Sequence, residues 1–243
     1  DLAYVGPGVM ASAVAMDKDM LKRVLKEHGI PVAESVTVFR GRYDLKSLQS
    51  AFPYPVFVKP ANMGSSVGIS KVKRAEDLEA ALLLASEFDR KILVERGISG
   101  REFECSVLGN EDPQAAIPCE VLPSREFYDY EDKYLLDTAQ TIVPAPLDAA
   151  QTQELQRIAV EAYRAAGCEG MSRVDFLMEA ATGTLYVNEI NTIPGFTSIS
   201  MYPRMWEAAG VPFSDLLDRL IGLYSEEHVL VGLLNVVLLM HVS

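Results

Sequence analysis

The residues best suited to chemistry lie on two expected neighbouring strands, 172–178 and 184–191. Side chains alternate between the two faces of a strand. One face of each strand is therefore rich in functional groups: Arg173, Asp175 and Leu177 on the first, Glu189 and Asn191 on the second. Carboxylate and amide oxygens suit magnesium, which usually takes few protein ligands, and an arginine beside them would stabilise a charged transition state. The alternative is an ordinary strand pair with one solvated face.

A polar loop directly after these acids favours the functional interpretation. It reads Asn191-Thr-Ile-Pro-Gly-Phe-Thr-Ser-Ile-Ser200. The amide of Gly195 can face an oxyanion, and Ser200 can face a carboxylate.

A second group of candidate residues surrounds Lys59, at the end of an expected strand over residues 54–60. The following residues, Pro-Ala-Asn-Met-Gly-Ser-Ser-Val-Gly68, form a small-residue hairpin that offers amides and hydroxyls to a phosphate with little bulk. The spacing is not that of a Walker A loop, so an ordinary turn remains the alternative. Lys18 and Lys133 are further cations, each of which alone would be a solvated lysine.

A third segment runs from an expected strand, 91–95, through a kinked link to Gly100. Such a link can offer main-chain groups to an adenine, and Glu102 can accept hydrogen bonds from ribose hydroxyls. A loop with salt-bridged acids is the alternative.

The surrounding pattern predicts two mixed lobes. Asp17 is expected to cap a helix that buries an apolar stripe and shows a polar side made of Lys18, Lys22 and Arg23. Further elements of the first lobe are a strand at 35–39, helices at 44–51 and 75–88, and a strand at 68–72. The second lobe is expected to hold strands at 102–108, at 114–121 and near Thr141, with a helix at 149–166. Two final helices are expected near 201–209 and 213–226.

Composition limits the possible partners. The chain has 22 basic and 34 acidic residues, a net charge of −12, which disfavours nucleic acid and anionic membrane surfaces. Three cysteines without a C-x-x-C pair indicate neither disulfides nor zinc and fit a reducing cytoplasm. No secretory signal opens the sequence. The apolar run 229–242 is shorter than a membrane-spanning helix; a buried element is favoured over an interaction segment.

Together the motifs resemble the ATP-grasp enzymes, and among them the D-alanine:D-alanine ligases. The matching segments are Met16-Asp-Lys18, Val58-Lys-Pro-Ala-Asn-Met-Gly-Ser-Ser-Val-Gly68, Val94-Glu-Arg-Gly-Ile-Ser-Gly-Arg-Glu102, Phe127-Tyr-Asp-Tyr-Glu-Asp-Lys-Tyr134, Arg173-Val-Asp175 and Asn188-Glu-Ile-Asn-Thr-Ile-Pro-Gly-Phe-Thr-Ser-Ile-Ser-Met201. They follow the family's order from about Val5 to Leu223.

The resemblance implies an α+β ATP-grasp fold, in which two α/β lobes with mainly antiparallel sheets grip the nucleotide between them. We expect a central lobe at 1–95, a C-terminal lobe at 96–228 and an apolar tail of unknown role at 229–243. The implied reaction phosphorylates the carboxylate of one D-alanine with ATP, and the amine of a second D-alanine attacks the acylphosphate. The product would serve peptidoglycan precursor synthesis in the bacterial cytoplasm.

The resemblance also implies roles for individual residues. Those expected to bind ATP are Lys18, Lys59, Glu95, Arg96, Ile98, Glu102, Phe127, Lys133 and Leu177. Two magnesium ions, or manganese in their place, would be held by Asp175, Glu189 and Asn191. The catalytic set would be Arg173, Gly195, Ser65 and Tyr134, and the second amino acid would be positioned by Ser200 and Met201. Tyr134 stands where relatives that join D-lactate have a histidine, which implies a dipeptide product.

Two features depart from the family pattern. The family normally begins with a further lobe that holds part of the first D-alanine site, and this sequence starts just before Gly6. We therefore expect these 243 residues to bind nucleotide and magnesium with weak or no turnover alone, unless another chain supplies the missing lobe. Homodimerisation is expected from the family, although the absence of that lobe would affect its usual interface. The apolar tail has no counterpart in the pattern. Another carboxylate-amine ligase of the same superfamily and a non-catalytic nucleotide-binding piece are the alternatives.

Overall fold

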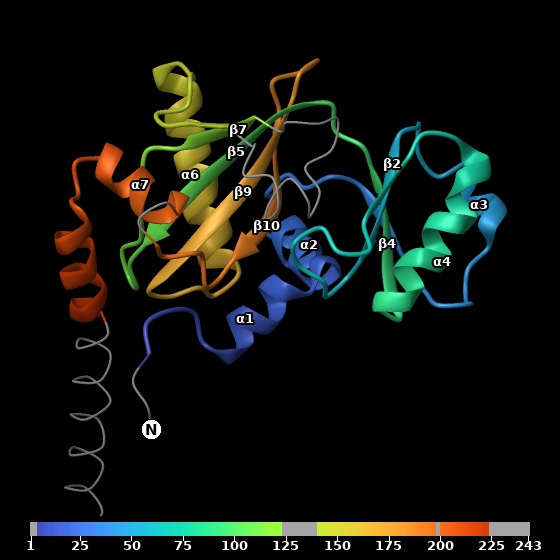
Figure 1. The fold of residues 1–243 in the computed structure, drawn as a ribbon, viewed down its shortest axis with the longest axis horizontal. Coiled ribbons are helices and arrows are strands. Elements are labelled where there is room, and N and C mark those ends of the chain that lie inside the picture. Colours follow the sequence, from blue (N-terminus) through green and yellow to red (C-terminus); the bar gives the residue numbers. More distant parts are fainter. Residues whose placement is uncertain (1–3, 123–139, 198–199, 224–243) are drawn as a thin grey trace, which may run out of the picture.

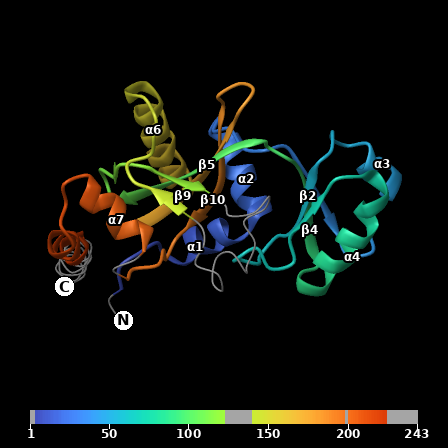
Figure 2. The same ribbon diagram turned by 45° about the horizontal axis from the view of Figure 1, so that its top comes forward.

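Two antiparallel sheets lie side by side in the computed structural model, which describes residues 4–122, 140–197 and 200–223. The first sheet has the strand order β1-β4-β2-β3, and the second has the order β10-β9-β5-β7-β8 with β6 paired to β5. Figures 1 and 2 show the two sheets joined through the link between β4 and β5. The prediction of a mixed fold with mainly antiparallel sheets is confirmed.

The first sheet is covered by one amphipathic helix. Its strands are β1 (Ser35–Phe39), β2 (Val56–Pro60), β3 (Ser70–Val72) and β4 (Lys91–Arg96). Helix α3 (Leu45–Gln49) lies in the connection from β1 to β2, and a short 3-10 turn (Ala75–Asp77) leads into α4 (Leu78–Phe88). Leu78, Ala81, Leu82 and Ala85 recur at helical spacing and are buried in one cluster with strand residues such as Val58. This stripe explains why α4 packs on the sheet.

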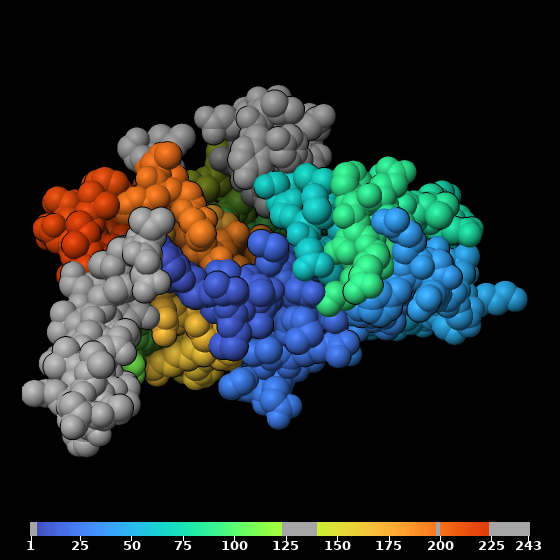
Figure 3. Space-filling view, turned by 90° about the horizontal axis from the view of Figure 1, so that it is seen from below, coloured from blue at the N-terminus to red at the C-terminus, as the bar shows by residue number. Residues whose placement is uncertain are grey.

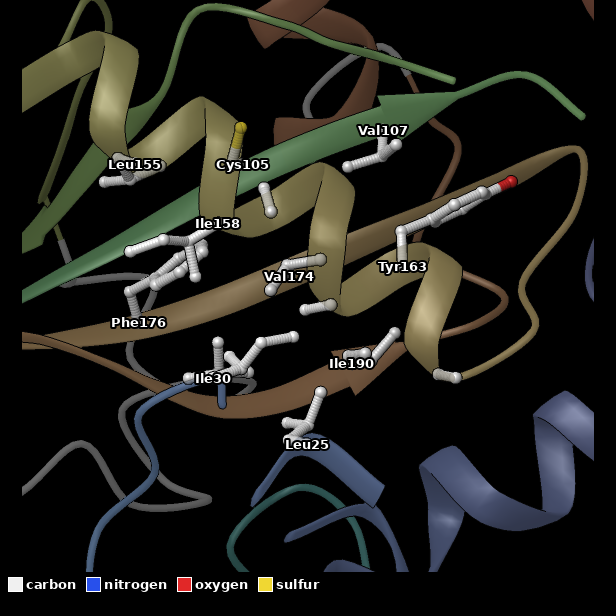
Figure 4. Close-up of a cluster of buried hydrophobic side chains, with 14 of the residues drawn as sticks. Leu25, Ile30, Cys105, Val107, Leu155, Ile158, Tyr163, Val174, Phe176 and Ile190 are labelled. Atoms are coloured by element: carbon white, nitrogen blue, oxygen red, sulfur yellow. The ribbon is translucent and has the colours of Figure 1, made fainter. Parts of the chain in front are cut away.

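The second sheet buries one face under a long helix and leaves the other polar. Its strands are β5 (Gly100–Leu108), β6 (Gln114–Ala115), β7 (Cys119–Leu122), β8 (Gln140–Ile142), β9 (Met171–Glu179) and β10 (Leu185–Asn191). Helix α6 (Ala149–Ala165) begins with a capping box between Asp148 and Gln151. Figure 4 shows α6 over the inward side chains of β5 and β9, among them Val107, Val174 and Phe176. Alternate residues of β9 therefore face away from α6.

One expected strand is divided in two. The stretch 114–121 forms β6 and β7, separated by residues 116–118. Pro118 precedes β7 and has no amide hydrogen for a ladder bond. The carbonyl of Pro118 accepts a hydrogen bond from the backbone amide of Ala145, which lies between β8 and α6.

The N-terminal helices pack on the second sheet rather than the first. Helices α1 (Val9–Met16) and α2 (Lys18–Glu27) contribute Ala11, Ala15, Leu21 and Leu25 to the core beneath α6. They lie between the two lobes in Figure 3. The first sheet ends with Arg96 of β4 and the second begins with Gly100 of β5, but α1 and α2, which precede both sheets in the sequence, complete the second core. The lobe boundary at residue 95 stays a prediction.

The polar side predicted for α2 is wrong for two of its three residues. Asp17 caps the helix by accepting from the amides of Asp19 and Met20, as expected. Lys18 and Lys22, however, are only 9% and 5% exposed, whereas Arg23 is exposed. Both lysines are buried because their ammonium groups contact polar groups of the first lobe. Helical spacing alone cannot predict these distant contacts.

The C-terminal part closes one end of the second sheet. Helix α7 (Met201–Ala208) and a helical stretch at 213–223 bury Tyr202, Met205, Trp206 and Leu216 against strand residues. Within the described part of the chain, no helix combines the length and apolarity needed to cross a bilayer. The apolar run 229–242 lies outside the described residues.

Candidate active site

The outward face of the second sheet carries three aligned rows of side chains. Residues that are register partners on β5, β9 and β10 form these rows: Glu102, Leu177 and Tyr186; Glu104, Asp175 and Glu189; Ser106, Arg173 and Asn191. Partners directly opposite one another in a sheet lie about 5 Å apart. The strands therefore bring six of the expected site residues, from three separate segments, onto one surface.

A β-bulge at Asn188 sets this arrangement on β10. The register shifts between Val187 and Glu189, so Asn188 is the extra residue. Without it, strict alternation would place Tyr186 and Glu189 on opposite faces. With it, both lie opposite outward-facing residues of β9, and Ile190 remains in the core.

Arg173 is the only basic residue in these three rows of described residues, and it lies among acids. Its Nε and a terminal nitrogen donate to the two oxygens of Asp175 at 2.7 and 2.8 Å. The same guanidinium lies 3.3 Å from Glu104. Burial would lower the pKa of Arg173, but Asp175, Glu104 and Glu189 outweigh it and hold the pKa well above the usual value. The Asn191 amide nitrogen donates to Asp175 at 2.9 Å.

This donor set fits a magnesium ion whose remaining ligands are water and the oxygens of a phosphate. Within the described ranges, no three His, Cys, Asp or Glu side chains are placed to form a protein-only metal site. Magnesium does not require one, because it is usually held by one or two carboxylates together with water and substrate phosphates. Asp175 and Glu189 are register partners and Asn191 contacts Asp175 directly. A cation there would compete with Arg173 for Asp175.

A second charge cluster is buried at the edge of the first lobe. Glu95, 2% exposed, lies between two ammonium groups: Lys59 Nζ at 2.6 Å and Lys22 Nζ at 2.7 Å. Burial by itself would raise the pKa of Glu95, but Lys59 and Lys22 lower it to about 2. Lys59 also lies 3.4 Å from Asn188 Oδ1, at the bulge of β10. The expected phosphate-binding lysine thus lies where the two lobes meet.

The hairpin after Lys59 is held by Lys18. The Lys18 ammonium donates to the carbonyl of Met63 at 2.5 Å, and its backbone amide donates to Ala61. Ser65 and Ser66 adopt the left-handed region, with φ of 52° and 61°. The backbone at Gly68 is packed so closely that a Cβ would meet the ring of Phe88 at 2.6 Å.

Arg96 joins the two lobes through its side chain. One terminal nitrogen donates to Glu179 at 2.8 Å and the other to the hydroxyl of Tyr186 at 3.2 Å. The amides of Arg96 and Gly97 are bonded to the carbonyls of Glu34 and Pro55. Ile98 follows, half-buried. The expected contacts of Glu95, Arg96 and Ile98 with adenine stay predictions.

The loop after β10 folds back so that Gly195 and Ser200 lie close together. A Cβ at Gly195 would lie 3.1 Å from Ser200 Oγ. That hydroxyl accepts from the amide of Thr197 at 3.0 Å, and Met201 begins α7. The roles of Ser65, Gly195, Ser200 and Met201 stay predictions. Phe127, Lys133 and Tyr134 lie outside the described residues.

Sequence reasoning missed several participants. Glu104 was detectable, because Glu102 and Glu104 alternate on one strand and must share a face. Lys22 is one helical turn after Lys18, but its burial depends on Glu95, 73 residues away. The positions of Tyr186 and Asn188 depend on the β-bulge, which strict alternation along the sequence does not predict.

Comparisons with known proteins agree with this arrangement. A family profile described as "D-ala D-ala ligase C-terminus" matches residues 24–222. The D-alanine–D-alanine ligase of Solibacter usitatus is 62% identical over 94% of this chain and 70% of its own length. That of Thermoanaerobacter sp. is 52% identical over 94% of this chain and 65% of its own. This chain belongs to the D-alanine–D-alanine ligase family.

Solved structures of the family share the fold. The D-alanine-D-alanine ligase from Coxiella burnetii superposes with a TM-score of 0.83 at 39% identity, covering 97% of this chain and 65% of that one. The VanG D-Ala:D-Ser ligase from Enterococcus faecalis gives 0.84 at 42% identity, covering 90% of this chain and 64% of that one. The fold is ATP-grasp, as the motifs predicted. The chain thus spans about two thirds of the length of these D-alanine–D-alanine ligases.

Proposed function

We propose that this chain supplies the nucleotide- and metal-binding part of an ATP-dependent D-alanine–D-alanine ligase acting in peptidoglycan synthesis in the bacterial cytoplasm. The observation that carries the proposal is the pair of charge clusters facing the lobe boundary. One combines Lys59, Lys22 and Glu95, with a surplus of positive charge, and the other gathers carboxylates around Arg173. A polyanionic nucleotide with its divalent cations needs both.

In the proposed reaction, the terminal phosphoryl group of ATP is transferred to the carboxylate of one D-alanine. Lys18 and Lys59 would bind phosphate oxygens, and Glu102 and Leu177 would contact the ribose and the base. Asp175, Glu189 and Asn191 would hold magnesium, which would neutralise the charge of the phosphates. Manganese would substitute for it.

The second step joins the two amino acids. The amine of the second D-alanine attacks the acylphosphate carbonyl, and phosphate leaves as the amide bond forms. Arg173 and the amide of Gly195 would stabilise the oxyanion of the tetrahedral intermediate. Ser65, Ser200, Met201 and Tyr134 would position the second D-alanine and close the site.

Two measurements test the proposal. Because the chain spans about two thirds of its relatives' length, magnesium-dependent ATP binding is the direct test for these 243 residues. We expect saturable ATP binding that strengthens with Mg²⁺. Binding of ATP that is unchanged by Mg²⁺ contradicts the assignment of Asp175, Glu189 and Asn191.

The choice of acceptor is the second question. A ligase of this family with a D-Ala:D-Ser specificity superposes closely on the chain, so a different second amino acid is a competing function. Phosphate release from ATP is measured with D-alanine alone, and with D-alanine plus D-serine or D-lactate. Turnover by these 243 residues alone should be weak or absent, and any product formed with D-alanine alone should be D-alanyl-D-alanine. ATP affinity that D-alanine leaves unchanged favours a non-catalytic nucleotide-binding protein. Homodimerisation, expected from the family, is tested by sedimentation.

A further inference from the structure

Lys22 is buried in the first lobe and contacts none of the residues expected to touch substrate except Glu95. It lies on α2, one helical turn after Lys18, with only 5% of its surface exposed. Its ammonium contacts Glu95 Oε2 at 2.7 Å and donates to the carbonyl of Ala33 at 3.1 Å. Burial and the neighbouring positive charges lower the pKa of Lys22, and Glu95 opposes this.

The contacts form a chain across four elements. Lys22 of α2 holds one oxygen of Glu95 on β4, and Lys59 of β2 holds the other at 2.6 Å. Lys59 then reaches Asn188 at the bulge of β10, in the second lobe. Because an ammonium group lies within 2.7 Å of each oxygen of Glu95, the two lysines oppose rotation of the carboxylate, and the carboxylate in turn orients Lys59.

The charge balance of this chain of contacts depends on Lys22. With both lysines, one carboxylate faces two ammonium groups and the cluster keeps one positive charge. Without Lys22, Lys59 and Glu95 form a neutral pair, and the attraction of Lys59 for a nearby anion is weakened. A buried ion pair offsets its desolvation only when its remaining lone pairs are also satisfied, so Lys22 stabilises the Lys59–Glu95 pair and also supplies the charge that makes the cluster positive.

We propose that Lys22 is a positioning residue of the nucleotide site, which acts through Glu95 to orient Lys59 and to keep a surplus positive charge beside the nucleotide's phosphates. This rests on the proposed function, because it takes the phosphates to lie at Lys59. Lys22 itself does not touch the nucleotide.

The test compares a nucleotide with its phosphate-free counterpart. Dissociation constants for Mg²⁺-ATP and for adenosine are measured on the full chain and on Lys22→Met, an apolar replacement of similar length. We expect Lys22→Met to weaken ATP binding about tenfold, the loss typical when a supporting partner of a binding group is removed. Adenosine affinity should stay within about twofold, because adenosine lacks the phosphates.

Matched variants separate positioning from folding. Lys22→Arg keeps the charge and should recover most of the ATP affinity, and Lys26→Met removes an exposed lysine of the same helix and should leave both affinities unchanged. Thermal unfolding is recorded for each variant. If Lys22→Met does not fold, Lys22→Gln, which removes the charge but keeps a polar side chain, replaces it in the same comparison.

Three results would overturn the inference. A folded Lys22→Met with wild-type ATP affinity removes the positioning role. Equal weakening of ATP and adenosine shows that Lys22 serves only the fold. A wild-type chain that binds neither ligand removes the proposed function itself, and the inference with it.

Discussion

Two charge clusters lie where the lobes meet. The first has an excess of positive charge and the second has an excess of negative charge. In the first, two lysines share one buried carboxylate, Glu95. In the second, one guanidinium, Arg173, is surrounded by Asp175, Glu104 and Glu189 on half-buried strand positions. A surplus cation beside a boundary attracts phosphate, whereas surplus carboxylates attract divalent metal. The difference supports the proposal that Mg²⁺-ATP binds between the lobes, with the phosphates near the first cluster and the metal near the second.

The largest expected loss of stability comes from removing Glu95, the single negative charge between the two lysines of the first cluster. Glu95→Gln leaves two buried ammonium groups without a carboxylate, and we expect it to cost about 3–5 kcal/mol of unfolding free energy. Lys59→Met leaves the neutral Lys22–Glu95 pair and should cost about 1 kcal/mol. Urea unfolding of both variants checks this asymmetry. Equal losses would show that the charge imbalance is not what matters.

Acid should weaken the first cluster in a defined range. The pKa of Glu95 in the folded chain is about 2, against an ordinary value of 4.5. Its stabilising contribution is complete above pH 4.5 and is lost as the pH falls from there toward 2. The difference in unfolding free energy between wild type and Glu95→Gln should shrink by about 2 kcal/mol between pH 6 and pH 3. A difference that does not change with pH would contradict the ionised state of Glu95.

The second cluster should respond to metal. Asp175→Asn removes the carboxylate that contacts both Arg173 and Asn191. We expect it to reduce the apparent Mg²⁺ affinity in the presence of ATP by about 10–100-fold. Asp218→Asn, an exposed position on the last helix, is the control. Calorimetric titration of Mg²⁺ into each ATP-saturated chain measures the change, and an unchanged affinity would remove Asp175 from the metal site.

An exposed cluster, also made of one charge between two opposite charges, should show the smallest loss of unfolding free energy. On α6, Arg157 contacts Glu154 at 2.6 Å and Glu161 at 2.5 Å, with about half of each side chain exposed. Solvent screens such pairs, so Arg157→Ala should lower stability by less than about 1 kcal/mol. Urea unfolding beside Glu95→Gln gives the comparison. A loss above about 2 kcal/mol would show that burial does not distinguish the clusters.

Most of the framework followed from local patterns in the sequence. Alternation placed Asp175 and Arg173 together, and the aspartate cap with the apolar stripe after it located α2. These features depend on residues a few positions apart, whose relation is fixed by backbone geometry. The family motifs supplied the remaining expected site residues, whose roles stay predictions.

Only the tertiary structure decided which distant groups meet. The bulge at Asn188 turns Glu189 and Asn191 to the side of Asp175, and Lys22 is buried because Glu95 lies opposite it. Arg96 contacts Glu179 and Tyr186 rather than solvent. Lys22 and Arg96 are separated from these partners by 73 to 90 residues, so no local periodicity encodes the contacts. Their pairing is fixed by sheet register and by the need to compensate buried charge.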